Sequence, residues 1–139
     1  MRHTAATNLG LFLLRFGVGM VFLIFGCDKL PHPFNWVGWI PNSVSQMIEK
    51  TGWLSTFEFL WIQGILEGLI GIQLLFGFLT RWSALGAAGI LAFIIYFLKF
   101  DQIGIRDLGL FFSALSIFSL GGGDWSIDGW IERRFDHEK

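Results

Sequence analysis

An apolar run from Phe57 to Leu79 constrains this chain more than any other feature. At the helical rise of ~1.5 Å per residue, the run is long enough to cross the ~30 Å hydrocarbon layer of a membrane with some tilt. Glu67 lies near its centre. Because an ionisable side chain facing lipid at that depth costs at least ~2.5 kcal/mol, we expect Glu67 to face other helices, and we treat it as a candidate functional residue.

Small residues accompany Glu67 on one face of this predicted helix. At about 100° per residue, the shared face also holds Gln63, Gly64, Gly68 and Gly71. Glycine lets helix backbones approach closely in a membrane, so this face is predicted to pack against a neighbouring helix.

The composition supports a membrane class. The chain has 139 residues, of which 53% are hydrophobic and 17% aromatic, with a mean hydropathy of +0.58. These values predict a single integral membrane domain. The net charge of -1 is uninformative, because it averages an apolar interior and charged ends, but no basic cluster suggests nucleic acid as a partner. The lone cysteine excludes an internal disulfide.

The predicted fold is all-α: an integral membrane four-helix bundle with interfacial amphipathic segments. Its spans cover about residues 9–27, 57–79, 82–98 and 105–120. The first run is longer than a signal-peptide core, contains Arg15 and ends in Gly-Cys-Asp-Lys, so we expect it to be retained. The second and third spans are predicted to form a tight antiparallel hairpin.

Two segments are predicted to lie at the membrane surface. The connection 31–54 is Trp-rich and contains a short helix capped by Asn42 or Ser43 and ending at Gly52; it could equally form a lid over the bundle. The tail 121–139 has tryptophans as interfacial anchors. Four spans place both termini on one side, and a slight excess of Lys and Arg there favours the cytoplasm, for a multi-pass protein of the cell (inner) membrane.

The charged residues suggest one ion pair and one site. Arg15 and Glu67 each lie a few residues from the centre of a span, so we predict an Arg15–Glu67 ion pair. Polar residues also gather at the end of the bundle away from the termini, which we call the mouth, and this cluster is the stronger candidate for ligand contact. Its members are Cys27, Asp28, Lys29, His32, Glu58, Lys99, Asp101, Arg106 and Asp107.

The predicted pocket residues are Arg15, Lys29, Glu67, Tyr96, Arg106 and Asp107. No residue is assigned a catalytic role, and no His, Cys, Asp and Glu spacing indicates a metal site. Structural alternatives stay open: the Arg15–Glu67 pair could only fix the helix register, the charges at the mouth could be a solvated rim, and Cys27 could be a small buried residue.

Three segments together resemble the DoxX-like membrane proteins: LRFGVGMVFLIFGCDKL, EGLIGIQLLFGFLTRWSALGAAGIL and RDLGLFFSALSIFSLGGGDWSID. The resemblance covers roughly residues 9–130. The main departure is the long Trp-rich connection, so the resemblance indicates no specific partner. The matching positions are Arg15, Gly26, Lys29, Glu67, Gly68, Gly71, Arg81, Arg106 and Asp107.

The resemblance implies a small subunit of a quinone-linked membrane oxidoreductase, with quinone as the candidate cofactor and none bound covalently. No histidine lies inside a predicted span, where a haem iron would need one, so a self-contained electron-transfer enzyme is not expected. The expected partners are the lipid bilayer and other membrane subunits or a second copy. Two other functions stay open: a non-catalytic accessory or assembly subunit of a respiratory or photosynthetic complex, and a small transporter working as an oligomer.

Overall fold

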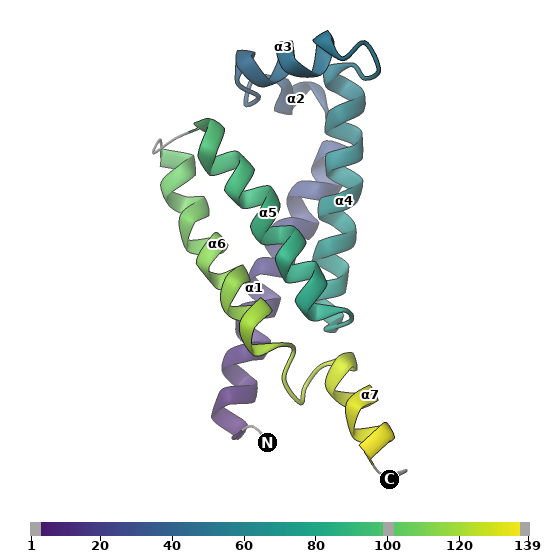
Figure 1. Cartoon of the computed structure of the whole chain (residues 1–139), viewed down its shortest axis with the longest axis vertical. Helices are drawn as coiled ribbons and strands as arrows, with labels where there is room; N and C mark the ends of the chain where they lie inside the picture. Colours follow the sequence, from purple (N-terminus) through teal and green to yellow (C-terminus); the bar gives the residue numbers. More distant parts are fainter. Residues whose placement is uncertain (1–3, 99–101, 137–139) are drawn as a thin grey trace.

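The computed structural model describes residues 4–98 and 102–136, and within these ranges it contains helices and no strand. This confirms the all-α class. Figure 1 shows the arrangement of the helices, which are α1 (Ala5–Lys29), α2 (Phe34–Val37), α3 (Asn42–Lys50), α4 (Thr56–Phe76), α5 (Thr80–Leu98), α6 (Gln102–Leu120) and α7 (Ile127–Asp136).

Three helices of the described chain, α1, α4 and α5, are long and apolar enough to cross a membrane. The protein is therefore an integral membrane protein whose apolar helices require a lipid bilayer. The fourth predicted span corresponds to α6; its crossing of the membrane, and the surface location of residues 31–54 and of the tail, stay predictions.

Local signals explain where the long helices begin and end. The Thr4 hydroxyl accepts a hydrogen bond from the backbone N–H of Thr7, so α1 starts before the predicted span. Ser55 and Glu58 form a capping box at the start of α4, and Gly77 ends that helix with a φ of 68°. Only residues 77–79 separate α4 from α5, which confirms the predicted hairpin.

The predicted cap of α3 is wrong. The helix begins at Asn42, and the residue before it is Pro41, with no side-chain cap. The Pro41 carbonyl accepts hydrogen bonds from the backbone N–H groups of Val44 and Ser45. Since Pro41 already has a φ of -57°, it can start the helix without a side-chain acceptor. Gly52, with a φ of 67°, follows the end of α3 as predicted.

The long helices form two pairs. The packing is most extensive between α1 and α4 and between α5 and α6. The pairs share a core of small and aliphatic residues and diverge from the 77–79 turn toward α2 and α3, as Figure 1 shows. The core residues are Val18, Phe22, Leu74, Ala84, Ala87, Ala88, Leu91, Ala114 and Ile117.

Glycines let α1 and α4 pack closely, as predicted for the Glu67 face. A Cβ added to Gly71 would lie 2.5 Å from the backbone nitrogen of Leu23, and one added to Gly26 would lie 2.7 Å from the carbonyl oxygen of Gly64. Side chains at these positions would force the helices apart. Gly68 behaves differently, because a Cβ built there meets no atom within 4 Å.

The start of α1 and all of α7 lie at the same end of the molecule (Figure 1), and hydrogen bonds between distant segments hold this end together. The Asp128 carboxylate on α7 accepts hydrogen bonds from the backbone N–H groups of Leu79 and Thr80, at 2.9 and 2.7 Å. A carboxylate is favoured at a helix N-terminus, so Asp128 serves as a cap for α5 from a remote part of the chain.

Candidate functional site

The predicted Arg15–Glu67 ion pair is wrong. Glu67 is paired with Lys29, whose ammonium nitrogen contacts Oε2 of the carboxylate. The cause is the register of the antiparallel α1–α4 pair: Gly26 contacts Gly64 and Gly68, so the last turn of α1 lies beside Glu67. Arg15 lies closer to the N-terminus of α1, beside the C-terminal end of α4.

Arg15 is instead a buried link to the end of the molecule that carries the termini. Its Nη1 donates to the carbonyl oxygen of Leu74 at 3.3 Å, and its Nη2 donates to that of Trp125 at 2.6 Å. The side chain is 1% exposed. Leu74 is near the end of α4, and Trp125 belongs to the segment 121–126 that follows α6. Arg15 therefore connects α1 to α4 and to the C-terminal part of the chain.

The Lys29–Glu67 pair is buried and further hydrogen-bonded. The side chains of both residues are 5% exposed. Nε2 of Gln63 donates to Oε1 of Glu67 at 2.9 Å, so each carboxylate oxygen has a partner. The Lys29 ammonium also lies 4.6 Å from the ring centroid of Trp36, a cation–π contact. A buried ion pair is tolerated only with such additional partners.

A second ion pair lies at the start of α6. Nε and Nη2 of Arg106 both approach Oδ1 of Asp107, at 2.9 and 2.8 Å. Asp107 is buried, whereas the Arg106 side chain is 56% exposed. The guanidinium carbon of Arg106 lies 5.6 Å from the ring centroid of Phe25 on α1.

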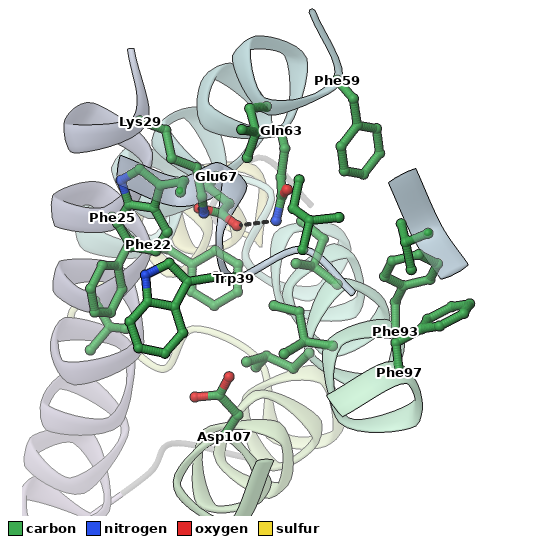
Figure 2. Close-up of a pocket in the computed structure, with 18 of the residues that line it drawn as sticks. Phe22, Phe25, Lys29, Trp39, Phe59, Gln63, Glu67, Phe93, Phe97 and Asp107 are labelled. Carbon is green, nitrogen blue, oxygen red and sulfur yellow. Dashed lines mark hydrogen bonds and ion pairs between the residues drawn. The ribbon is translucent and has the colours of Figure 1, made fainter. Parts of the chain in front are cut away.

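Both ion pairs line one cavity of about 300 Å³. It lies where the two helix pairs diverge, beneath α2 and α3, and Figure 2 shows Glu67, Gln63 and Asp107 among rings that come from several helices. The polar lining residues are Lys29, Gln63, Glu67, Arg106 and Asp107, and the aromatic ones are Phe22, Phe25, Trp36, Trp39, Phe59, Phe93 and Phe97.

The chemistry of this cavity suits a small, flat, neutral molecule. Each ion pair is neutral in sum, so the lining gives no preference for a charged ligand. The aromatic rings offer stacking surfaces, and Lys29, Gln63 and Arg106 supply hydrogen-bond donors. The volume is at the lower end of the ~300–1,000 Å³ of ligand sites, which suits a headgroup better than a whole long-chain molecule.

Four of the predicted pocket residues come together in the cavity: Lys29, Glu67, Arg106 and Asp107. Arg15 and Tyr96 do not line it. Tyr96 is 76% exposed, and its ring packs edge-to-face with the Phe97 ring, with the two centroids 5.1 Å apart. An α-helix has only one face toward the cavity, and on α5 that face carries Phe93, Ile94 and Phe97.

The other members of the predicted mouth cluster have separate roles or locations. Glu58 caps α4, and Asp28 accepts a hydrogen bond from Nε1 of Trp36 at 2.9 Å. Cys27 and His32 are exposed, so the buried alternative for Cys27 is wrong. Lys99 and Asp101 lie outside the described residues. Within residues 4–98 and 102–136, no cluster of His, Cys, Asp and Glu could hold a metal ion.

Sequence patterns missed how much the segment from α2 to α3 contributes to the site. Trp36, Trp39, Ile40, Pro41 and Val44 all line the cavity. The density of aromatic residues between two prolines was the available signal, and it agrees with the lid alternative for residues 31–54. The helix period predicts Gln63 on the Glu67 face, but it does not show that the Gln63 amide donates to the carboxylate.

Comparisons with known proteins identify a family. The DoxX family profile matches residues 10–99, which include nearly all of α1 and the whole of α2, α3, α4 and α5. No curated protein and no solved structure matches the chain. Since the profile covers more than half of the sequence, this chain belongs to the DoxX family of membrane proteins.

Proposed function

We propose that this protein binds the ring of a lipid-soluble quinone in the cavity beneath α2 and α3, as a membrane subunit of a redox complex. One observation carries the proposal: an aromatic cavity within the apolar helices is lined by two neutral ion pairs that offer hydrogen-bond donors. A quinone has flat apolar faces and carbonyl acceptors at its edge, and this lining complements both features.

The proposed roles follow from the positions of the polar groups. Lys29 and Gln63 would donate to one edge of the ring, and Arg106 would approach from the α6 side. Reduction of a quinone adds a proton at each carbonyl oxygen, and the Glu67 and Asp107 carboxyl groups, which also line the cavity, are candidates to relay these protons. The electrons would come from a partner subunit.

Quinone titration of the purified protein in lipid nanodiscs tests this proposal. We expect saturable binding of a short-chain benzoquinone, and at least ~10-fold weaker binding in Lys29→Gln, because losing a charge-assisted hydrogen bond costs ~1.5–3 kcal/mol. Glu58→Gln is the control, since Glu58 is exposed at the α4 cap and a glutamine retains the capping box. Unchanged affinity in Lys29→Gln, or no saturable binding to the wild type, would contradict the proposal.

The accessory-subunit alternative has a separate observation in its favour. Large aromatic side chains project outward, with Trp53 89%, Phe34 76% and Trp82 72% exposed. Exposed aromatic residues also suit contact with lipid headgroups. Purification in mild detergent separates the two functions: stoichiometric partner proteins without bound quinone would favour the accessory role, whereas quinone that copurifies and is lost in Lys29→Gln would favour the binding site.

A further inference from the structure

We infer that the apolar tail of the bound molecule leaves the cavity sideways, between α4 and α5, directly into the bilayer. This inference rests on the proposed function and adds the route by which the ligand enters and leaves. The site would take amphiphiles already dissolved in the membrane, ring first, and would not load from water.

The side of the cavity covered by α2 and α3 is closed by anchored contacts. Trp36 donates to Asp28 at 2.9 Å. The Phe34 and Phe57 rings lie 4.6 Å apart, which joins α2 to α4. The Thr56 hydroxyl donates to Oε1 of Glu49 at 3.3 Å, and this hydrogen bond joins α3 to α4. We call α2 and α3 together the α2–α3 cover. Opening this side would break all of these contacts together.

The sides between α1 and α4 and between α5 and α6 are closed by helix packing. Glycine contacts bring α1 against α4, and α5 packs extensively on α6. Between α1 and α6, the Arg106 guanidinium lies over the Phe25 ring while it pairs with Asp107. Passage there would separate the Arg106 guanidinium from the Phe25 ring, and the cation–π contact would be lost.

The side between α4 and α5 is built differently. These helices are close at Gly86, where an added Cβ would lie 3.3 Å from Cδ1 of Ile70, and they diverge beyond it (Figure 1). Phe59 on α4 and Phe93 and Phe97 on α5 line the cavity on this side (Figure 2). Phe93 lines the cavity and is also 41% exposed.

The α4–α5 border is apolar and weakly fixed. Phe93 and Phe97 contact each other, with centroids 4.6 Å apart, whereas Phe59 has no ring contact among the described residues. Rotation of the Phe59 side chain therefore breaks no hydrogen bond or ring pair. The border carries no charged side chain, and the Lys29 ammonium is buried. A hydrocarbon tail fits such an exit, and a polar chain would be left without partners.

Photolabelling in nanodiscs tests the route. Two benzoquinone probes are used, one with a diazirine on the ring and one with a diazirine at the end of a decyl chain. We expect the ring probe to label residues near Lys29 and Gln63, and the chain probe to label Phe59, Phe93 or Phe97. An excess of unlabelled decyl-benzoquinone should remove both signals. Phe112, which is 58% exposed on α6, is the control for non-specific labelling. Excess decyl-benzoquinone should not reduce the labelling of Phe112 by either probe.

The two probes separate the failure of the route from the failure of the proposed function. Competable ring labelling combined with chain labelling at Trp39 or near Phe25 would overturn the α4–α5 route alone. Ring labelling that excess ligand does not remove would overturn the proposed function. In addition, Phe93→Trp should slow decyl-benzoquinone binding several-fold because it narrows the opening, while Phe112→Trp should leave the rate unchanged; equal rates in both variants would contradict the route.

Discussion

Buried charge is the main constraint on individual residues of this protein. Glu67 is held inside an apolar helix because Lys29 neutralises it and Gln63 satisfies its second oxygen. Arg15 is equally buried but bonds to backbone carbonyls, where a guanidinium can use several donors at once. The two cations of α1 therefore have different roles: one lines the candidate site and the other connects the ends of helices.

A double-mutant cycle tests the Lys29–Glu67 pair. Lys29→Met should destabilise the protein by ~3–5 kcal/mol, because it leaves a carboxylate buried without its cation. The double variant Lys29→Met with Glu67→Leu should recover much of that loss, since neither charge remains. The measurement is the free energy of unfolding in mixed micelles.

A surface ion pair provides the control for this cycle. Arg133 lies 3.6 Å from Asp124 and both side chains are partly exposed, so Arg133→Gln should cost less than ~1 kcal/mol. If the losses of stability from the Lys29 and Glu67 substitutions simply add, with no recovery in the double variant, the two side chains are not energetically coupled.

Among the helices, the α1–α4 contact decides the geometry of the site. Gly19 and Gly26 on α1 meet Gly64 and Gly71 on α4, and this spacing fixes the register that sets Lys29 beside Glu67. The α4–α5 contact is less extensive and leaves room for the cavity. The same chain thus uses close packing on one side of α4 and an opening on the other.

Glycine substitutions test whether the close packing of α1 on α4 sets the geometry of the site. Gly71→Ala should destabilise the protein and weaken quinone binding, because its Cβ would lie 2.5 Å from the backbone nitrogen of Leu23 and would push α1 away. Gly17→Ala is the matched control on α1, where a Cβ meets nothing within 4 Å. Alanine is better than glycine in a helix by up to ~1 kcal/mol, so this variant should be neutral or slightly stabilising. Equal losses of thermal stability would show that α1 and α4 are not held by this contact.

At the level of the whole molecule, the two ends differ. The candidate site and its α2–α3 cover lie at one end, and the start of α1 and all of α7 lie at the other (Figure 1). If α6 crosses the membrane, both termini lie on one side. We propose the cytoplasmic side of the cell (inner) membrane, from the slight excess of Lys and Arg in the segments near the termini.

Cysteine labelling tests this topology in a Cys27→Ser background. A membrane-impermeant maleimide added to spheroplasts should label Thr51→Cys, and it should label Glu132→Cys only after permeabilisation; both residues are exposed. Labelling of both positions from outside would mean that α6 does not cross. The reverse pattern would retain the four crossings and invert the orientation.

The sequence by itself determined the elements of this protein. Long apolar runs, the Ser55–Glu58 capping box and Gly77 are local features, and hydrogen bonds within a helix depend only on nearby residues. The same local features placed Glu67 on a glycine-rich face and Lys29, Arg106 and Asp107 at helix ends. They were therefore sufficient to nominate all four charged residues of the cavity.

Only the tertiary structure decided which charges meet. Both Arg15 and Lys29 lie on the α1 face that packs against α4, so the choice between them depends on how far the helices slide past each other. That offset results from close contacts between glycines on separate helices, and no local pattern reports it. The same holds for the α2–α3 cover and for Asp128 at the start of α5, because their partners are distant in the chain.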